Sequence, residues 1–255
     1  MKKTALSAIT ALLICAPFTL AEDEEKLGIT LDLTYVSKWL SKGVEAYGQK
    51  GGLFKTVDFD LYNTGFGVKV IHRNSISAGY VDKERFDFRP YYKNKFFEGQ
   101  PHQTNYNISV GYEYYPGLSR PKANTTWEWV LALSWPELLD SGIVPAYIVH
   151  YEYPVSGGDT NAHVSGWVHR FLLSYDLDVP ELESPLHLSA ELAYLDGLGG
   201  REHDWAYNTY GISTKFTLAE NLALVPGLYH QISIGDTVSK AKDITYTQIS
   251  LKYKF

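Results

Sequence analysis

Hydrophobic and polar residues alternate one by one along most of the chain. Between Asn221 and Ile234, leucine and isoleucine recur at alternate positions, and small or polar residues fill most of the positions between them. Because successive side chains of a β-strand point to opposite faces, this pattern predicts a strand with one apolar and one polar face. Residues 105–114, 127–135 and 186–194 repeat the pattern. The alternation therefore predicts an all-β protein.

Seven further segments follow the same rule less regularly, so the sequence holds eleven candidate strands. They lie at 29–39, 54–62, 66–73, 105–114, 127–135, 143–153, 163–177, 186–194, 205–218, 221–234 and 244–255. Breaks rich in Gly, Asn and Asp separate many of them, as at 63–65, 156–159 and 197–200. No apolar run long enough for a membrane-spanning helix follows Ala21, and no shift in composition marks a domain boundary. Residues 27–255 are expected to form one domain.

Aromatic residues decide what the apolar face contacts, since alternation alone fits both a soluble sandwich and a membrane barrel. On the apolar face they gather near strand ends. Tyr and Trp at such positions are typical of the girdles that lie at the two membrane surfaces of a barrel. The residues expected to form these girdles are Trp127, Trp129, Trp135, Tyr112, Tyr114, Tyr151, Tyr153, Tyr253 and Phe255.

Charged residues of both signs occupy the opposite face in mid-strand. A lysine or arginine that faced lipid there would cost about 2 to 4 kcal/mol at the bilayer midplane, so these side chains are expected to face a wet lumen. The residues expected to line the pore are Asp32, Lys38, Asp58, Asp60, Lys69, Arg73, Glu113, Glu128, Glu191, Lys215 and Lys252. Their fields and the space that they leave would select the solutes that pass.

The fold expected from these two faces is a closed antiparallel transmembrane β-barrel, because closure leaves no unpaired strand edge in lipid. Bacterial single-chain barrels have even numbers of strands, so eleven is wrong by one. Residues 80–92 are predicted to contain the missing strand, which gives twelve. Ten or fourteen strands stay possible. Residues 74–102 could instead form a loop that narrows the mouth of the pore.

The first 21 residues read as a secretory signal peptide, with Lys2 and Lys3 before an apolar run and Ala21 at the expected cleavage site. Its removal would leave an acidic tail at 22–26 and take away Cys15, the one cysteine of the 255 residues. Disulfides, thiolate metal sites and cysteine nucleophiles are then ruled out. The full chain has a net charge of −6, which argues against a nucleic-acid partner. No cofactor or metal is expected.

Two segments carry a family resemblance. The final strand, with Ile249, Leu251, Tyr253 and terminal Phe255 on one face, resembles the C-terminal signature of bacterial outer-membrane β-barrels. That resemblance implies recognition by the barrel-assembly machinery. Residues 35–43, read as YVSKWLSKG, are similar to the opening strand and turn of the TorF-type putative porins, with Lys42 where that family usually has Arg.

The expected function is a porin-like channel for passive diffusion of small hydrophilic solutes, in the outer membrane of a Gram-negative bacterium and in contact with its lipids. A structural or surface-binding barrel without an open pore is the alternative. A lipid hydrolase is a second alternative, because His163 and Ser165 share a strand face and a histidine could take the serine proton. His187 and Glu191 share a strand face and could pair or bind a metal, but without further ligands of known spacing a hydrogen-bond network in the lumen is expected instead. The sequence leaves the solute, the ion selectivity and the oligomeric state open.

Overall fold

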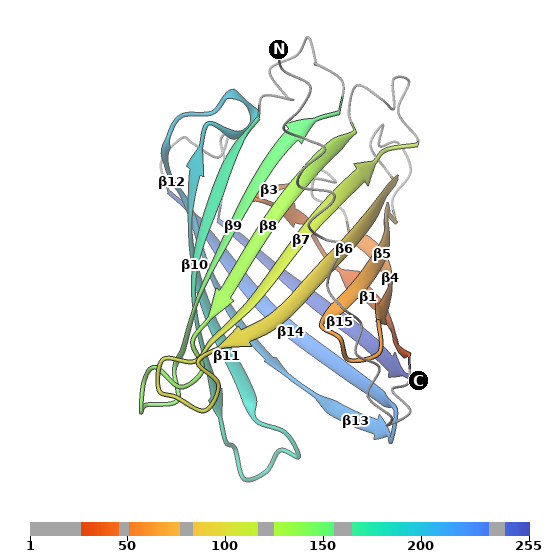
Figure 1. Cartoon of the computed structure of the whole chain (residues 1–255), viewed down its shortest axis with the longest axis vertical. Coiled ribbons are helices and arrows are strands. Elements are labelled where there is room, and N and C mark those ends of the chain that lie inside the picture. The colour runs from red at the N-terminus through yellow and green to blue at the C-terminus, as the bar shows by residue number, and fades with distance from the viewer. Residues whose placement is uncertain (1–26, 46–50, 77–83, 117–124, 156–164, 235–242) are drawn as a thin grey trace.

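The chain forms one closed antiparallel β-barrel (Figure 1). Its fold is taken from a computed structural model, which describes residues 27–45, 51–76, 84–116, 125–155, 165–234 and 243–255. The sheet has 13 strands, of which short β13 pairs only with β14, and the other twelve close the ring. None of the helices in these described ranges is long and apolar enough to cross a membrane. The predicted twelve-stranded barrel is confirmed.

The twelve ring strands are 9 to 13 residues long. They are β1 (Gly28–Val36), β4 (Gly52–Asp60), β5 (Phe66–Ser75), β6 (Glu84–Phe96), β7 (Thr104–Tyr114), β8 (Thr126–Ser134), β9 (Val144–Pro154), β10 (Gly166–Leu177), β11 (Leu186–Asp196), β12 (Asp204–Thr214), β14 (Leu222–Ser233) and β15 (Ile244–Lys254). The remaining elements are the two-residue strands β2 (Leu40–Ser41) and β3 (Val44–Glu45), β13 (Phe216–Ala219) and a 3-10 turn at Leu198–Gly200.

Each ring strand pairs with its neighbours in chain order, and the last strand closes the ring on the first. Leu33 of β1 lies opposite Leu251 of β15, and the pairing continues from Thr30 to Val36. Closure satisfies the backbone groups that an open sheet edge would leave unpaired. Strands β2 and β3 pair only with each other and take no part in this ring.

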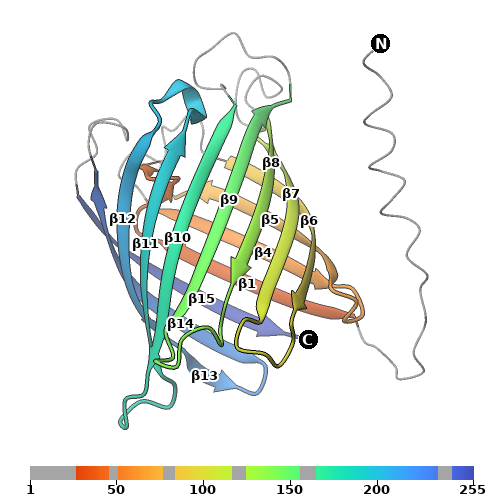
Figure 2. The same ribbon diagram turned by 60° about the vertical axis from the view of Figure 1, so that its left-hand side comes forward.

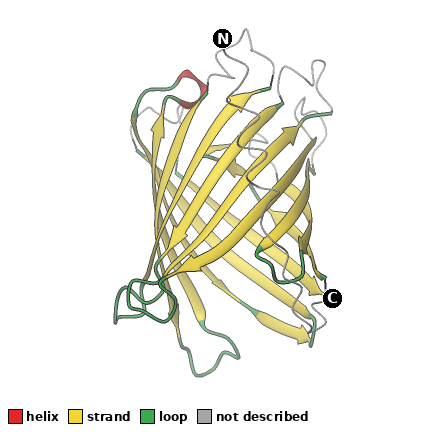
Figure 3. Cartoon of the chain, viewed as in Figure 1, coloured by secondary structure: helices red, strands yellow, loops and turns green. Residues whose placement is uncertain are grey.

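The two ends of the barrel differ in their connections (Figure 3). At one end, called the turn end here, lie the links at 61–65, 97–103, 135–143, 178–185 and 215–221, together with Leu27 and Phe255. The other end, the loop end, holds the connections that follow β1, β5, β7, β9, β11 and β14. The predicted inner turns at 63–65, 136–139, 179–182 and 218–221 all lie at the turn end.

The strand proposed at 80–92 exists, but its bounds are shifted along the chain. β6 runs from Glu84 to Phe96, and residues 80–83 lie outside the described part. The segment is therefore a ring strand rather than a constricting loop. The end was misplaced because Lys93, Asn94 and Lys95 are polar in a row, which hides the alternation that the backbone pairing with β7 maintains.

The alternation places apolar side chains outside the ring and polar ones inside. On β1, Leu31, Leu33 and Tyr35 are 38%, 44% and 37% exposed, whereas Thr34 and Val36 between and beyond them are buried at 8% and 3%. Neighbouring strands continue both faces in register, as Leu33 lies beside Leu251 and Thr34 beside Ser250. The outer face is an apolar belt, and the packed part of the protein lies inside the barrel.

Candidate functional site

A short hairpin lies inside the barrel near its loop end (Figures 1 and 2). β1 ends at Val36, and the chain then bends through Ser37 and Lys38 into the two-residue strands β2 and β3. Ser37 anchors the bend, because its amide donates to Thr247 O at 2.9 Å and its Oγ accepts from Thr247 N at 2.8 Å. The lumen hairpin is the name used below for residues 39–45.

Lys42 sits at the tip of the lumen hairpin, between two carboxylates of the barrel wall. Its Nζ lies 3.0 Å from Glu128 Oε1 of β8 and forms an ion pair with Glu152 of β9. The side chains of these three residues are only 14%, 4% and 15% exposed. His150 adds a hydrogen bond of 3.0 Å to the same Glu128 oxygen. The hairpin tip is thus held by buried charge.

Gly43 brings the hairpin backbone against the opposite wall. Its φ of +82° is a conformation that side chains rarely adopt, and a Cβ there would lie 2.4 Å from the ring of Tyr207. Its carbonyl accepts a 3.0 Å hydrogen bond from Gln231 Nε2 of β14. Glycine is therefore required for both the turn and the close approach.

The other two hairpin contacts are apolar or aromatic. Trp39 is buried, stacks edge-on against Phe54 with ring centroids 5.4 Å apart, and lies under the guanidinium groups of Arg73 and Arg85 at 5.4 and 5.1 Å. On the far side, Val44 packs against the cluster of buried lumen residues Val168, Ala193, Leu195, Leu198, Ala206 and Tyr207.

A network of buried ion pairs surrounds the hairpin on β5 to β8. Arg85 donates to Glu113 Oε2 at 2.8 Å and to Asp87 Oδ2 at 3.0 Å, and Arg73 lies 2.9 Å from the same Asp87 oxygen. Arg89 pairs with Glu128. Buried charges of this kind are stable only when paired, so each of these groups fixes its neighbours.

Three carboxylates of this network, those of Glu113, Glu128 and Glu152, have oxygens within 4.8 Å of one another. That spacing would suit a metal ion, but cationic side chains already contact each of the three. Lys42 contacts two of them, and Arg85 contacts Glu113. Ion pairing with lysine and arginine therefore accounts for this cluster.

A second ion pair lies across the lumen on β10 to β12. Arg170 Nε donates to Glu191 Oε1 at 2.7 Å, and Tyr207 OH donates to the same oxygen at 2.9 Å. His187 bonds to Asp176 Oδ1 at 2.6 Å instead of joining Glu191. Glu191 belongs to a hydrogen-bond network, and its pairing with His187, left open by the sequence, does not occur.

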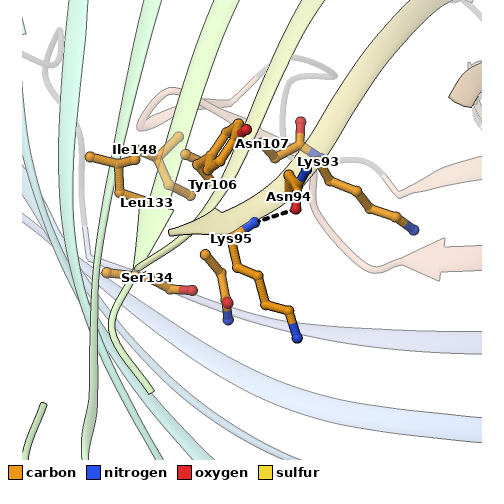
Figure 4. Close-up of a pocket in the computed structure, with 11 residues that line it drawn as sticks. Lys93, Asn94, Lys95, Tyr106, Asn107, Leu133, Ser134 and Ile148 are labelled. Atoms are coloured by element: carbon orange, nitrogen blue, oxygen red, sulfur yellow. Dashed lines mark hydrogen bonds between the residues drawn. The ribbon is translucent and has the colours of Figure 1, made fainter. Parts of the chain in front are cut away.

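The turn-end half of the lumen is more open. Its charged pairs are separate and partly exposed: Asp58 with Lys69 at 3.2 Å, Asp60 with Lys93 at 2.6 Å and Asp32 with Lys252 at 3.7 Å. A recess of about 480 Å³ lies in this half. It is lined by Lys93, Lys95, Asn105, Asn107, Ser134, Ala132, Ala146 and Ile148, among others, and Figure 4 shows its polar side chains along β6 to β8.

The structure brings most of the predicted pore-lining residues to the inner face. Strand pairing places Asp32, Asp58, Asp60, Lys69, Arg73, Glu113, Glu128, Glu191 and Lys252 there. Two predicted positions are wrong as strand positions. Lys38 lies in the bend after β1, and Lys215 is exposed in the connection after β12. Both strands end earlier than the sequence pattern suggested.

The predicted girdle residues lie on the outer face, at two heights. Tyr112, Tyr114, Trp127, Trp129, Tyr151 and Tyr153 lie towards the loop end of three neighbouring strands, while Trp135, Tyr253 and Phe255 lie at the turn end. Tyr112 and Trp127 pack edge-on at 4.9 Å, as do Tyr253 and Phe255 at 4.8 Å. Their contact with a membrane surface stays a prediction.

Sequence reasoning missed several charged residues of the lumen. These are Lys42, Arg85, Asp87, Arg89, Glu152 and Arg170. A signal was present for three of them, because charged residues 85, 87 and 89 alternate with Phe86, Phe88 and Pro90. Lys42 gave no such signal, since its partners Glu128 and Glu152 lie 86 and 110 residues further along the chain.

One polar group contradicts the expectation that charge lies only inside. Lys55, His72 and Glu84 lie on the outer face near the loop end, where His72 Nε2 is 2.7 Å from Glu84 Oε1 and Lys55 Nζ is 3.3 Å from His72 Nδ1. Opposite charges placed together near the rim reduce the cost of facing an apolar medium.

Solved barrels similar to this chain include a KdgM porin, the NanC porin and an outer-membrane channel from Pseudomonas putida F1. Their TM-scores are 0.53, 0.52 and 0.52, at 9%, 9% and 8% sequence identity. They cover 89%, 88% and 94% of this chain, and the matches span 99%, 98% and 99% of the respective neighbours. No protein-family model and no curated protein sequence matches the chain. The likeness shows a shared barrel fold.

Proposed function

We propose that this chain is an outer-membrane, porin-like channel for passive diffusion of small hydrophilic solutes. The observation that carries the proposal is the distribution of polarity: a closed barrel with an apolar exterior surrounds a lumen lined by charged pairs and amides. Water and polar solutes are stable against such an inner wall, and acyl chains are stable against such an exterior. The similarity to solved barrels described as porins or channels supports the same function.

The proposed path has two parts. Solutes at the turn end meet partly exposed charges of both signs and the recess of Figure 4. Farther along they meet the lumen hairpin, which places Trp39 and Lys42 across the passage. Solute choice would come from the fields of these side chains and the space between them. The predicted pore-lining residues on the inner face would act in this way.

The proposal includes how the protein reaches its membrane. Residues 1–21 would direct export, the outer-membrane lipids would surround the apolar belt, and the assembly machinery would bind the last strand through Phe255. Phe255 supports this by its place at the end of an outward alternating row, where it is 66% exposed. Membership of the TorF-type porins, suggested by residues 35–43, is part of the proposal.

The alternative of a barrel without an open pore is favoured by one observation. At the height of the lumen hairpin, wall residues such as Val168, Ala193 and Asp87 have no exposure at all. A barrel closed in this way would act through its surface loops. For the hydrolase alternative, Ser165 is exposed, and His163 lies outside the described residues. Unchanged lipid turnover in Ser165→Ala would dismiss it.

Conductance across a planar lipid bilayer separates the channel from the closed barrel. Purified folded protein is expected to give stepwise currents, whereas a boiled sample should give none. Complete absence of current, both from the wild type and from variants in which the hairpin is loosened, would contradict the channel function. Swelling of liposomes in solutions of sugars of increasing size would then rank the solutes that pass.

A further inference from the structure

We propose that the lumen hairpin is a gate and that Lys42 is the residue that both holds it closed and sets the charge selectivity of the passage. The inference rests on the proposed channel function and concerns how that channel opens. It is carried by the contacts of one hairpin with the barrel wall, the burial around it and the charge of its seat. The seat is the part of the inner wall that the hairpin tip contacts, with the carboxylates of Glu128 and Glu152.

The hairpin contacts the wall in four directions. Trp39 packs on β4 and under the arginines of β5 and β6, and Lys42 pairs with carboxylates of β8 and β9. Val44 packs on the cluster from β10 to β12, and Gly43 O accepts from Gln231 of β14. An element only a few residues long that contacts opposite sides of the ring must lie across the lumen.

Burial shows that this crossing is tight. Tyr207 and Gln231, which face the lumen from β12 and β14, are 4% and 2% exposed, and Glu113 and Glu128 across from them are 2% and 3% exposed. Inward-facing residues of an open channel would contact water. With the hairpin in place, the path at this height is closed to solutes.

The hairpin can leave without opening the barrel. β2 and β3 pair only with each other, and the twelve ring strands close through their own ladders. Leaving breaks the ion pairs of Lys42, the bond from Gln231 and the contacts of Trp39 and Val44, but no hydrogen bond between ring strands. An element that can separate from the ring while the ring stays intact meets the structural requirement of a two-state gate.

Charge at the seat gives Lys42 its second role. In the closed state its ammonium lies between Glu128 and Glu152, while Arg85 pairs with Glu113 and Arg89 pairs with Glu128. The imidazole of His150, which is hydrogen-bonded to Glu128, and the guanidinium of Arg170 on β10 also face this cluster. When Lys42 leaves, the carboxylates of Glu128 and Glu152 keep less positive charge beside them. An open passage with that excess should favour cations.

The test measures single-channel current and reversal potential for the full chain in planar bilayers. In Lys42→Gln the seat loses its cation, and we expect the open probability to rise at least about tenfold, since loss of a buried ion-pair partner shifts a two-state equilibrium strongly. The reversal potential under a salt gradient should move towards that of the cation. Lys42→Arg keeps the charge and should show the same low open probability as the wild type.

Two further variants separate gating from selectivity and from misfolding. Lys42→Gln combined with Glu128→Gln and Glu152→Gln leaves no unpaired carboxylate at the tip, so the channel should open without the cation preference. Lys55→Gln removes an equal charge from the outer face and should change neither property. Faster migration of unheated than of boiled protein on a detergent gel verifies that each variant is folded.

The outcomes are distinct. Equal open probability in the wild type and in folded Lys42→Gln and triple variants would overturn the gate while leaving the channel function standing. Opening without any difference in reversal potential between the single and the triple variant would overturn the selectivity role. Absence of current from every folded variant would overturn the channel function itself.

Discussion

Single charged residues inside this barrel differ greatly in how much they depend on their partners. Arg85 is 4% exposed and binds two carboxylates that are equally buried, whereas Lys95 at the turn end is exposed and pairs with exposed Glu98. A buried charge left alone has no water to replace its partner, but an exposed one is solvated again at once. Burial, more than the number of ion pairs, decides which of them stabilise the fold.

Replacing Arg85 by Met should therefore destabilise the protein strongly. Asp87 would keep Arg73 as a partner, but Glu113 would lose its shortest ion pair. The expected loss is about 3 to 5 kcal/mol, as for other buried pairs that lose one member. Denaturant unfolding in detergent, followed by tryptophan fluorescence, measures it. Lys95→Gln is the matched control and should change stability by about 1 kcal/mol or less; equal losses in both would refute the argument.

Gly43 offers a second prediction at this scale, because strain and collision can be separated. Gly43→Ala places a Cβ against Tyr207 at a φ of +82°, whereas Gly99→Ala meets a similar φ of +73° with nothing within 4 Å. Both should carry about 1 kcal/mol or more of backbone strain. Only Gly43→Ala should displace the hairpin, which hydrogen exchange of the amides of residues 40–44 would detect. Equal exchange in the two variants would show that Tyr207 does not limit the seat.

Strands and hairpins were not equally predictable from the sequence. In ring strands such as β8 and β15, apolar and polar residues alternate because one face contacts water or protein and the other contacts an apolar medium. The sequence pattern of such a strand therefore indicates which face each residue occupies. The lumen hairpin has no such pattern. Its neighbours come from nine different ring strands. The alternation that includes Tyr35 continues through Trp39, so the pattern predicts a longer β1 than the structure has.

The candidate site was predictable only in part for the same reason. Glu128 and Asp58 could be placed on the inner face by counting along their own strands. Which carboxylate receives Lys42 depends on how far the bend after Val36 carries the chain into the lumen, and no local pattern encodes that distance. The sequence of a strand predicts whether a residue lies on the inner or the outer face. The residue that it contacts across the lumen depends on the three-dimensional arrangement of the closed barrel.

The strand β8 allows a test of the two faces with neighbouring residues. Leu131 lies on the outer face beside Val149, and Ala132 lies on the inner face beside Asn107. Leu131→Arg should destabilise the barrel in a bilayer, lowering its free energy of unfolding by about 2 to 4 kcal/mol, as arginine does on the lipid face of barrels. Ala132→Arg should have a smaller effect, because it faces the recess. The folded fraction in lipid vesicles across a urea series measures both, and the reverse order would contradict the assignment of faces.

The whole molecule combines a rigid ring with one internal element that is not part of it. All twelve ring strands pair with two neighbours, so removal of any one would open the barrel. The lumen hairpin lies between β1 and β4 in the chain, pairs with no ring strand and is held inside the barrel by side-chain contacts. Stability therefore resides in the ring, and regulation can reside in the hairpin without cost to closure.

The orientation of the faces is the claim on which the rest depends, and nitroxide scanning of β8 in reconstituted membranes tests it most directly. Cys15 is the one cysteine of the sequence, so its replacement gives a cysteine-free background for labels at 129 to 134. Oxygen dissolved in the lipid should enhance the spin relaxation of nitroxides at 129, 131 and 133. A water-soluble nickel complex should enhance the relaxation of nitroxides at 130, 132 and 134. The opposite alternation, or none, would contradict a barrel with an apolar exterior and a wet lumen.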